Sequence, residues 1–551
     1  MRSIAMTGVM AAIGMWAGTA TAQDSHDHTV APSVPAVSAA EAKSEAHNHT
    51  DMTAPKTAQL LPGYGDGGFA VSGASPQAQA YFSNALELHA AFAHRAAVSA
   101  AKEAVRLDPA CAMCKWGAAL IDGPTINYGK DAKERVPLLA LARQARSGAR
   151  SGGAKERALT DALLIRYQPG DTGKADRGYA AAMAKVAGQF PQDNEIAVLA
   201  ADAAMVSAFV EGKDDYDHAA LFRAIALLEP VLARAPRHTP AIHFYIHATE
   251  VIGKPALAET YADALPALAP RASHLVHMPS HTWYWVGRYQ DAADTNRRAV
   301  EIGKDNARAL GIDDPKGVWD LPYHAHNVIY GLGGALMAGD SRTALDLARP
   351  LVERSADQDK GQPWSQLLAA SGYFALARFD PAAALAAPEP KLDYLKAARR
   401  YARGEALVWQ GDLAGAGAER NAIPEQIAKG PRKDWPHDAT VAAEAMLGIT
   451  RAVLDGRIAM AQGRFAEAAT AFRTGALLEE TKEFSDFSDP PAFWYPVRRD
   501  LAAALLAAGD AKGAQREAQA SLDLRKLDPV AGQILAAARL ALAKGPAAAL
   551  R

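Results

Sequence analysis

The chain has 551 residues, with 59 Lys and Arg against 61 Asp and Glu, which gives a net charge of −2. Such a balanced charge provides no bulk attraction to nucleic acid or to anionic lipid, so no partner of either kind is expected. Only two cysteines are present, which excludes a fold held together mainly by disulfides. The length is sufficient for several domains or for one long repeat array.

Residues 1–22 have the pattern of a secretory signal peptide. Arg2 supplies the positive start, an apolar stretch follows from Ile4 to Trp16, and small residues lead to Ala22. We expect cleavage after Ala22 and a periplasmic or secreted protein. No later stretch reaches the roughly 18 consecutive apolar residues that a membrane span requires, so no such span is expected.

Residues 23–74 are rich in Ala, Pro, Ser and Thr and poor in large apolar side chains, which predicts a disordered arm. The arm contains two His-x-His pairs, at residues 26–28 and 47–49. Neutral imidazoles are suited to collecting Cu(II) or Zn(II), but isolated pairs also fit a spacer with no binding role.

From residue 75 to residue 545, Ala- and Leu-rich amphipathic stretches alternate with short Gly, Pro or Asp turns, which predicts an all-α protein. Gly287, Gly339 and Gly463 are each followed by regularly spaced small residues. This pattern resembles the tetratricopeptide repeat (TPR), so we expect a TPR-like solenoid, a right-handed superhelix of helix pairs. The distance from Gly287 to Gly339 exceeds the period of about 34 residues, which predicts an inserted loop at about 303–322.

Cys111 and Cys114 form a Cys-Ala-Met-Cys sequence at a predicted helix start. In an oxidising compartment this pair fits a disulfide or, with Met113, a soft copper site. A redox dithiol is the less favoured interpretation, because no thioredoxin-like alternation of strands and helices surrounds the pair.

Two sets of residues lie one repeat apart in the chain. They are His243, His247 and Glu250, followed by His277, His281 and Tyr284. Counting from the turn glycines places both sets on the helix that lines the concave groove of a TPR array. The same counting adds His89, His274, His324 and His326 to the groove. His218, His238 and His437 have no such partners and are expected at the surface.

Metal binding is the interpretation that best explains this recurrence. We predict a site of His243, His247, His277 and His281 for copper or zinc, with Glu250 as a ligand or general base. His274 and His326 are further candidate ligands. The site belongs to a metal-handling protein or to a metal-dependent enzyme, and the alternative is a scaffold that binds a peptide or protein partner in the groove without metal.

Pro279 lies inside the second set, where it either kinks the helix or starts a new one. It also belongs to the sequence blocks that carry a more specific resemblance. These are His243-x-x-Ile246-His247-x-x-Glu250, His277-Met278-Pro279-Ser280-His281 and Tyr323-x-x-His326-Asn327. They are similar to the signature blocks of a family of exported bacterial TPR proteins. The resemblance spans most of residues 80–540 and implies the fold and the histidine set, without an activity.

Overall fold

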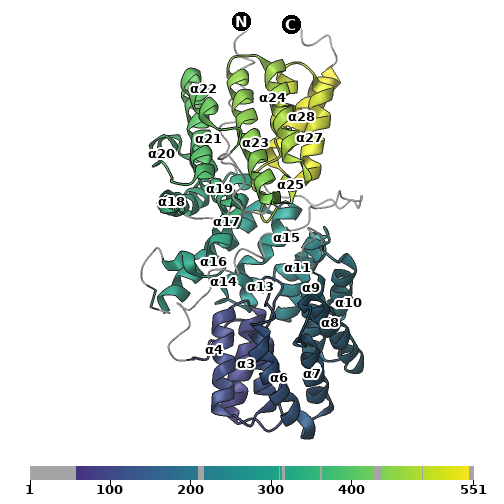
Figure 1. Cartoon of the computed structure of the whole chain (residues 1–551). Helices are drawn as coiled ribbons and strands as arrows, with labels where there is room; N and C mark the ends of the chain where they lie inside the picture. The colour runs from purple at the N-terminus through teal and green to yellow at the C-terminus, as the bar shows by residue number, and fades with distance from the viewer. Residues whose placement is uncertain are drawn as a thin grey trace. The chain divides into compact units, whose positions relative to one another are not determined.

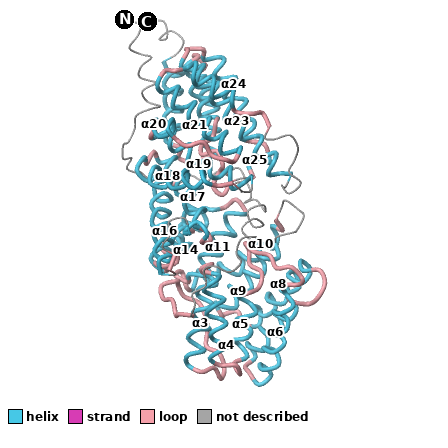
Figure 2. Tube along the Cα trace, turned by 60° about the vertical axis from the view of Figure 1, so that its left-hand side comes forward, coloured by secondary structure: helices cyan, strands magenta, loops and turns pink. Residues whose placement is uncertain are grey.

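The computed structural model describes residues 58–208, 216–309, 311–312, 317–359, 363–426, 437–486 and 488–544. Within these ranges the regular structure is helical, apart from isolated bridges such as the one between Ser488 and Pro491. Figure 2 shows helices joined by loops throughout. The predicted signal peptide and both His-x-His pairs lie outside the described residues.

The chain folds into two compact units, each of which is described by itself. The amino-terminal unit comprises Ala36–Thr282 and Arg298–Asn327, and the carboxy-terminal unit includes Trp283–Arg297 and Val328–Arg551. In both units, consecutive helices joined by short turns pack against each other, which confirms an all-α, TPR-like helical repeat (Figure 1). In the described part of the chain, no helix has both the length and the apolar character needed to cross a membrane.

The amino-terminal unit contains α3 (Pro76–Ala90), α4 (His94–Leu107), α5 (Ala112–Ile121), α6 (Arg135–Gly148), α7 (Ala154–Arg166), α8 (Thr172–Gln189), α9 (Asn194–Ala208), α10 (His218–Arg234), α11 (Thr239–Val251), α12 (Glu259–Ala262), α13 (Leu265–Leu268) and α14 (Ser273–His277). The division between the units falls within α15 (Pro279–Val286), α16 (Tyr289–Ala309) and α17 (His324–Ala338). The carboxy-terminal unit continues with α18 (Ser341–Asp357), α19 (Pro363–Phe379), α20 (Pro381–Ala386), α21 (Asp393–Gln410), α22 (Leu413–Ala422), α23 (His437–Ala461), α24 (Phe465–Glu479), α25 (Lys482–Ser485), α26 (Arg498–Ala507), α27 (Ala511–Leu524) and α28 (Pro529–Lys544).

The predicted turn glycines end helices in the structure. Gly287, Gly339 and Gly463 follow α15, α17 and α23 with φ of 92°, 80° and 73°, values that glycine adopts readily. Small residues then allow the paired helices to approach closely. A Cβ at Gly334 of α17 would lie 2.8 Å from the backbone nitrogen of Ala293 in α16, so glycine is required at this crossing.

Residues 58–74 form an ordered loop, so the predicted disordered arm extends too far along the chain. Asn84 of α3 exchanges hydrogen bonds with the backbone of Leu61, at 2.9 Å in each direction. The backbone nitrogen of Asp66 donates to the hydroxyl of Thr239 in α11, at 2.8 Å. The loop therefore ties α3 to α11, and buried Tyr64 helps to anchor it. The prediction rested on the average composition of residues 23–74, which does not reveal these specific contacts.

The inserted loop is shorter than predicted, because α16 continues to Ala309. Its last turns contain ion pairs at i,i+3 spacing, including Glu301 with Lys304, where the oxygen–nitrogen distance is 2.8 Å. Ion pairs at this spacing stabilise a helix modestly, which favours the helical conformation of these turns. A short helical turn, Gly317–Asp320, precedes α17.

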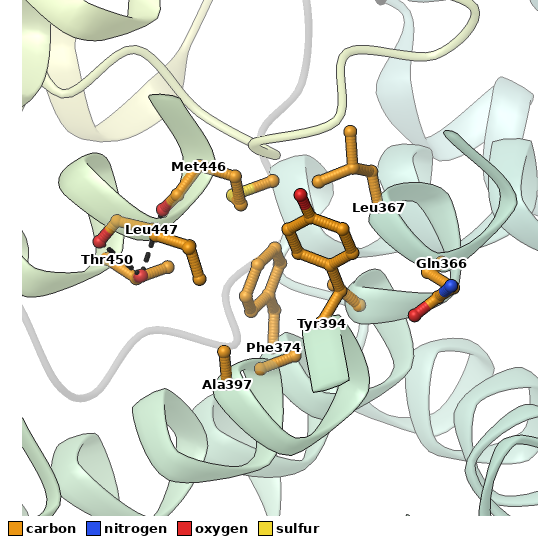
Figure 3. A pocket seen from close by; sticks show the side chains of 10 residues that line it. Gln366, Leu367, Phe374, Tyr394, Ala397, Met446, Leu447 and Thr450 are labelled. Carbon is orange, nitrogen blue, oxygen red and sulfur yellow. Dashed lines mark hydrogen bonds between the residues drawn. The ribbon is translucent and has the colours of Figure 1, made fainter. Parts of the chain in front are cut away.

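The carboxy-terminal unit has a small cavity between α19, α21 and α23, shown in Figure 3. Apolar and aromatic side chains form most of its wall, among them Leu367, Phe374 and Met446. The hydroxyl of Thr450, which also lines it, donates to the carbonyl of Met446 at 2.9 Å. The polar side chains of Gln366 and Tyr394 also line it.

Candidate metal centre

Helix α11 presents three of the predicted site residues on one face. His243, His247 and Glu250 are separated by four and three residues, which places them one above another on a helix, as predicted. His238 caps the start of this helix, where its Nδ1 accepts a hydrogen bond from the nitrogen of Ala241 at 3.3 Å. The ordered loop at residues 58–74 holds the same helix start through Thr239.

Pro279 starts a new helix, which decides between the two outcomes predicted for it. Helix α14 ends at His277 and α15 begins at Pro279, where the missing N–H of proline is tolerated. His274 and His277 therefore belong to α14 and His281 to α15. This change of helix alters which histidines can meet.

Six histidines in the amino-terminal unit form two groups of three. The first triad consists of His243, His247 and His274. The Nε2 of His243 lies 3.1 Å from the Nε2 of His247 and 3.1 Å from the Nε2 of His274. The three ring nitrogens thus converge on one point.

The second triad consists of His277, His281 and His326. The Nε2 of His281 lies 2.8 Å from that of His277 and 3.3 Å from that of His326. Asn327 at the start of α17 donates to Ser273 of α14 at 3.0 Å, which helps to bring His326 to the second triad.

The structure divides the four histidines of the predicted shared site, His243, His247, His277 and His281, between the two triads, and the shared site itself stays a prediction. Each i,i+4 pair is completed by a third histidine from another helix, His274 or His326, which the sequence suggested only as further ligands. The two triads adjoin. Ring centroids are 5.6 Å apart for His274 and His277, and 5.7 Å apart for His247 and His281.

The spacing of the nitrogens fits bound metal ions. Ligands held about 2.0–2.1 Å from an ion in tetrahedral directions lie about 3.3–3.4 Å from one another. In each triad two of the three nitrogen–nitrogen distances are 2.8–3.3 Å, close to this value, and the third is within 4.8 Å. Each triad would contribute three imidazole nitrogens, the number of protein ligands that is usual in catalytic zinc sites.

Burial keeps the first triad in its ligating form. His243 has no exposed surface, and His274 is only 5 % exposed. Burial lowers the pKa of His243 to about 3, and it lowers the pKa values of His247 and His274 well below 6.5, because a charged imidazolium is poorly solvated there. The neutral ring that results is the form that binds a metal ion.

Hydrogen bonds at the opposite ring nitrogens orient the histidines. The Nδ1 of His243 lies 2.6 Å from the carbonyl oxygen of Ala90, and the Nδ1 of His281 lies 2.7 Å from Oε2 of Glu250. Both oxygens are acceptors, so each Nδ1 carries the proton and each Nε2 presents its lone pair. In the second triad, His277 has Ser280 as a longer contact, 3.4 Å from its Nδ1 to the hydroxyl oxygen.

Glu250 lies against His281, and its predicted role as a ligand or general base stays a prediction. Its carboxylate is almost completely buried and contacts Nδ1 of His281, the ring nitrogen that faces away from the triad. A carboxylate in this position fixes the orientation of a metal-binding histidine and polarises its ring. The carbonyl of Ala90 was not predicted, because sequence spacing carries no information about a backbone oxygen brought from another helix.

Three residues predicted to line the groove do not join the triads. Tyr284 is 1 % exposed and packs in the carboxy-terminal unit, with its ring centroid 5.4 Å from that of Tyr289. His324 lies edge-on to Trp319 at 4.9 Å between ring centroids. His89 is buried apart from both triads, and burial lowers its pKa to about 4.

His238 corrects the expectation of a surface position. It is buried, and its Nε2 lies 2.9 Å from Oε1 of Glu195. His218 is exposed, as predicted, and the side chain of His437 lies outside the described residues.

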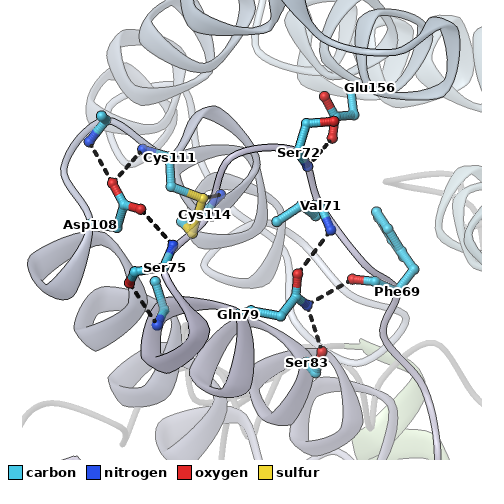
Figure 4. Close-up of a disulfide and its surroundings, with 12 residues drawn as sticks. Phe69, Val71, Ser72, Ser75, Gln79, Ser83, Asp108, Cys111, Cys114 and Glu156 are labelled. Carbon is cyan, nitrogen blue, oxygen red and sulfur yellow. Dashed lines mark hydrogen bonds between the residues drawn. A yellow bond between two sulfur atoms is a disulfide. The ribbon is translucent and has the colours of Figure 1, made fainter.

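Cys111 and Cys114 form a disulfide, one of the two favoured predictions (Figure 4). Asp108 organises the helix start before them, because its carboxylate accepts from the backbone nitrogens of Ser75 and Cys111, at 2.8 and 3.1 Å. Met113 is 1 % exposed. As a disulfide the sulfurs are not thiolate ligands, so the predicted soft copper site is absent from this state.

Two aromatic residues at the first triad were not predicted as site residues. The ring centroid of Phe92 is 4.4 Å from that of His243, and the ring of Tyr323 is 4.3 Å from that of His274. Both have positive φ, 55° and 64°. The only sequence signal was the place of Tyr323 in the Tyr-x-x-His-Asn block.

The chain matches no family model and no curated protein. Among solved structures, it is similar to yeast Tom70, with 12 % identity over 85 % of this chain and 89 % of that chain, at a TM-score of 0.28. A second is the APC/C heterotetramer Cut9–Hcn1, with 11 % identity over 84 % of this chain and 76 % of that chain, at a TM-score of 0.28. A third is the P58(IPK) TPR domain, with 11 % identity over 85 % and 99 %, at a TM-score of 0.22. Similarities of this size do not bear on function.

Proposed function

We propose that this protein binds two transition-metal ions, one in each histidine triad, and that the pair forms its functional centre. The observation that carries the proposal is the convergence of Nε2 atoms within each triad, together with the acceptors that hold the protons of His243 and His281 on the opposite nitrogens. Without an ion, the Nε2 lone pairs of His243 and His281 would each face two imidazole nitrogens, and one lone pair accepts well from only one N–H donor.

The donor atoms favour copper or zinc. Both triads offer neutral imidazoles, which suit these borderline ions, and neither triad contains the oxygen ligands that Mg²⁺ and Ca²⁺ require. Soft sulfur ligands give no preference for copper over zinc, because the sulfurs of Cys111 and Cys114 are joined in the disulfide. Copper and zinc are therefore both tested, and iron is included as a control.

The centre is suited to chemistry on a small molecule. Three protein ligands leave an open position on each ion, which is the usual arrangement of catalytic rather than structural metal sites. His247 and His326 are only partly buried, whereas the other four histidines are buried, so each triad has one member that reaches toward solvent. A bound ion would supply Lewis-acid or redox chemistry there, while the surrounding helices limit access to small ligands.

Metal analysis of the mature, tag-free protein tests the proposal. We expect about two equivalents of copper or zinc per chain after purification from the exported fraction, since each ion has three preorganised ligands. Protein that retains no copper, zinc or iron, and takes up none after dialysis against each ion, would contradict it. The alternative would then be favoured, a TPR-like scaffold that binds a peptide or protein partner, and the chain should be screened for such partners.

Glu250→Gln tests the orienting role of the carboxylate. We expect the affinity of the second triad for its ion to fall about 10- to 100-fold, because loss of an outer carboxylate partner weakens the histidine it orients. Titration with a competing chelator measures this change. Glu195→Gln is the matched control, because Glu195 contacts His238 in the same way outside the triads and its loss should leave metal affinity unchanged. Equal affinities for Glu250→Gln and wild type would exclude this role.

A further inference from the structure

Tyr323 lies directly beside the first triad. Its ring centroid is 4.3 Å from that of His274 and 6.1 Å from that of Phe92, and the side chain is 7 % exposed. Contact between a phenol ring and a metal-binding imidazole provides a short path for an electron. The ring is otherwise covered by protein, which protects a reactive state of the phenol from solvent.

The hydroxyl of Tyr323 is held in a directed set of hydrogen bonds. The amide nitrogen of Asn127 donates to it at 2.8 Å, so the phenol oxygen acts there as the acceptor. Its own O–H can then donate to Nε2 of His94, which lies 3.4 Å away. His94 is at the start of α4 and is only partly buried, so a proton received there has a route to solvent.

The backbone conformation of Tyr323 and Phe92 also indicates that the position of these rings is functional. Tyr323 and Phe92 have φ of 64° and 55°, a left-handed conformation that bulky residues rarely adopt. In the described part of the amino-terminal unit these are the only such residues other than glycine, and both rings contact the first triad. Strain of this kind persists where the surrounding structure imposes a particular geometry, often at a functional site.

We propose that Tyr323 is a redox-active residue that gives an electron to the ion of the first triad and its phenolic proton to Nε2 of His94. This inference rests on the proposed function, with copper as the ion. In the step, the phenolic O–H bond breaks, one electron leaves the ring, and a neutral tyrosyl radical remains. Hydrogen peroxide is the two-electron oxidant: one electron comes from the Cu(I) ion, which ends as Cu(II), and the other comes from Tyr323 by way of that ion. The peroxide O–O bond breaks, two protons come from solvent, and two waters form.

Rapid-freeze electron paramagnetic resonance tests this step. The full-length protein is loaded with copper, the copper is reduced to Cu(I), and the protein is then mixed with hydrogen peroxide. We expect a tyrosyl radical in wild type, whose hyperfine pattern changes when ring-deuterated tyrosine is incorporated. Tyr323→Phe should lose the signal while its copper content stays the same, because the phenylalanine ring keeps the packing. Tyr245→Phe is the matched control, since Tyr245 is buried on α11 with its hydroxyl donating to Glu229 away from both triads, and it should keep the signal.

His94→Gln separates the proton acceptor from the electron donor. Without the imidazole base, the radical should form more slowly and in lower yield, with copper content unchanged. A radical of wild-type yield in Tyr323→Phe, or no radical in wild type that holds copper, would overturn the proposal for Tyr323. Wild type that binds no copper would instead contradict the metal centre itself, so the two failures are distinguishable.

Discussion

His243→Ala is expected to lose the ion of the first triad and to keep the ion of the second. Removing one of three ligands leaves two nitrogens, too few to hold the ion tightly, whereas His277, His281 and His326 remain intact. Metal content per chain should therefore fall by about half. Elemental analysis after exhaustive dialysis measures this change, and His277→Ala should give the complementary result.

The double variant His243→Ala, His277→Ala should retain almost no metal. His218→Ala is the matched control, because His218 is an exposed histidine of the same unit and its loss should change nothing. Loss of both ions in each single variant would show that the histidines form one shared site, as their spacing in the sequence suggests. Unchanged metal content in both single variants would remove the triads from consideration.

The first triad should make the metal-free protein less stable as the pH falls below about 6.5. The pKa of His243 is about 3 in the folded protein, and those of His247 and His274 are also lowered by burial, whereas an unfolded histidine titrates near 6.5. Below pH 6.5 the unfolded chain therefore binds more protons than the folded one, so acid favours unfolding. At pH 5.5 each of these histidines should lower the free energy of unfolding by roughly 1 kcal/mol, and the three together by a few kcal/mol.

His238 has the opposite effect. Burial alone would lower its pKa, but the hydrogen bond and charge of Glu195 outweigh burial and raise it, so His238 contributes stability that is present at low pH and lost as the pH rises. Glu479 and Asp202 act in the same direction as His238, because burial raises the pKa of Glu479 to about 8 and that of Asp202 to about 6. The contribution of the first triad is therefore measured as a difference, by urea unfolding of chelator-treated wild type and His243→Ala at pH 7.5 and 5.5. Wild type should lose more stability between these pH values than the variant, and equal losses would contradict the assigned burial. Metal-loaded protein should resist acid until protons displace the ions.

The fold and the α11 half of the centre could be predicted from the sequence, because both depend on local spacing. Turn glycines such as Gly287 require a backbone conformation that other residues avoid, and they mark helix ends wherever the chain lies. His243, His247 and Glu250 share a face whenever their segment is helical, whatever packs against it.

The pairing of the histidines could not be predicted, because it depends on where helices begin and meet. Counting from Gly287 carried one register back to His274, and the sequence left open whether a new helix starts at Pro279, as α15 does. Tyr284 lies in α15 close to Gly287, so its packing among aromatic side chains is a tertiary effect that the counting does not describe. The groups that contact the Nδ1 atoms, such as the carbonyl of Ala90, come from other parts of the fold. The spacing of residues in the sequence does not indicate such contacts.

X-ray diffraction from crystals of the copper- or zinc-loaded protein, with data collected on both sides of the metal absorption edge, tests the two-ion centre most directly. We expect two anomalous peaks per chain. One should lie about 2.0–2.1 Å from Nε2 of His243, His247 and His274, and the other at the same distance from Nε2 of His277, His281 and His326. Absence of anomalous density at both triads, in crystals of protein that carries the metal, would contradict the proposed centre.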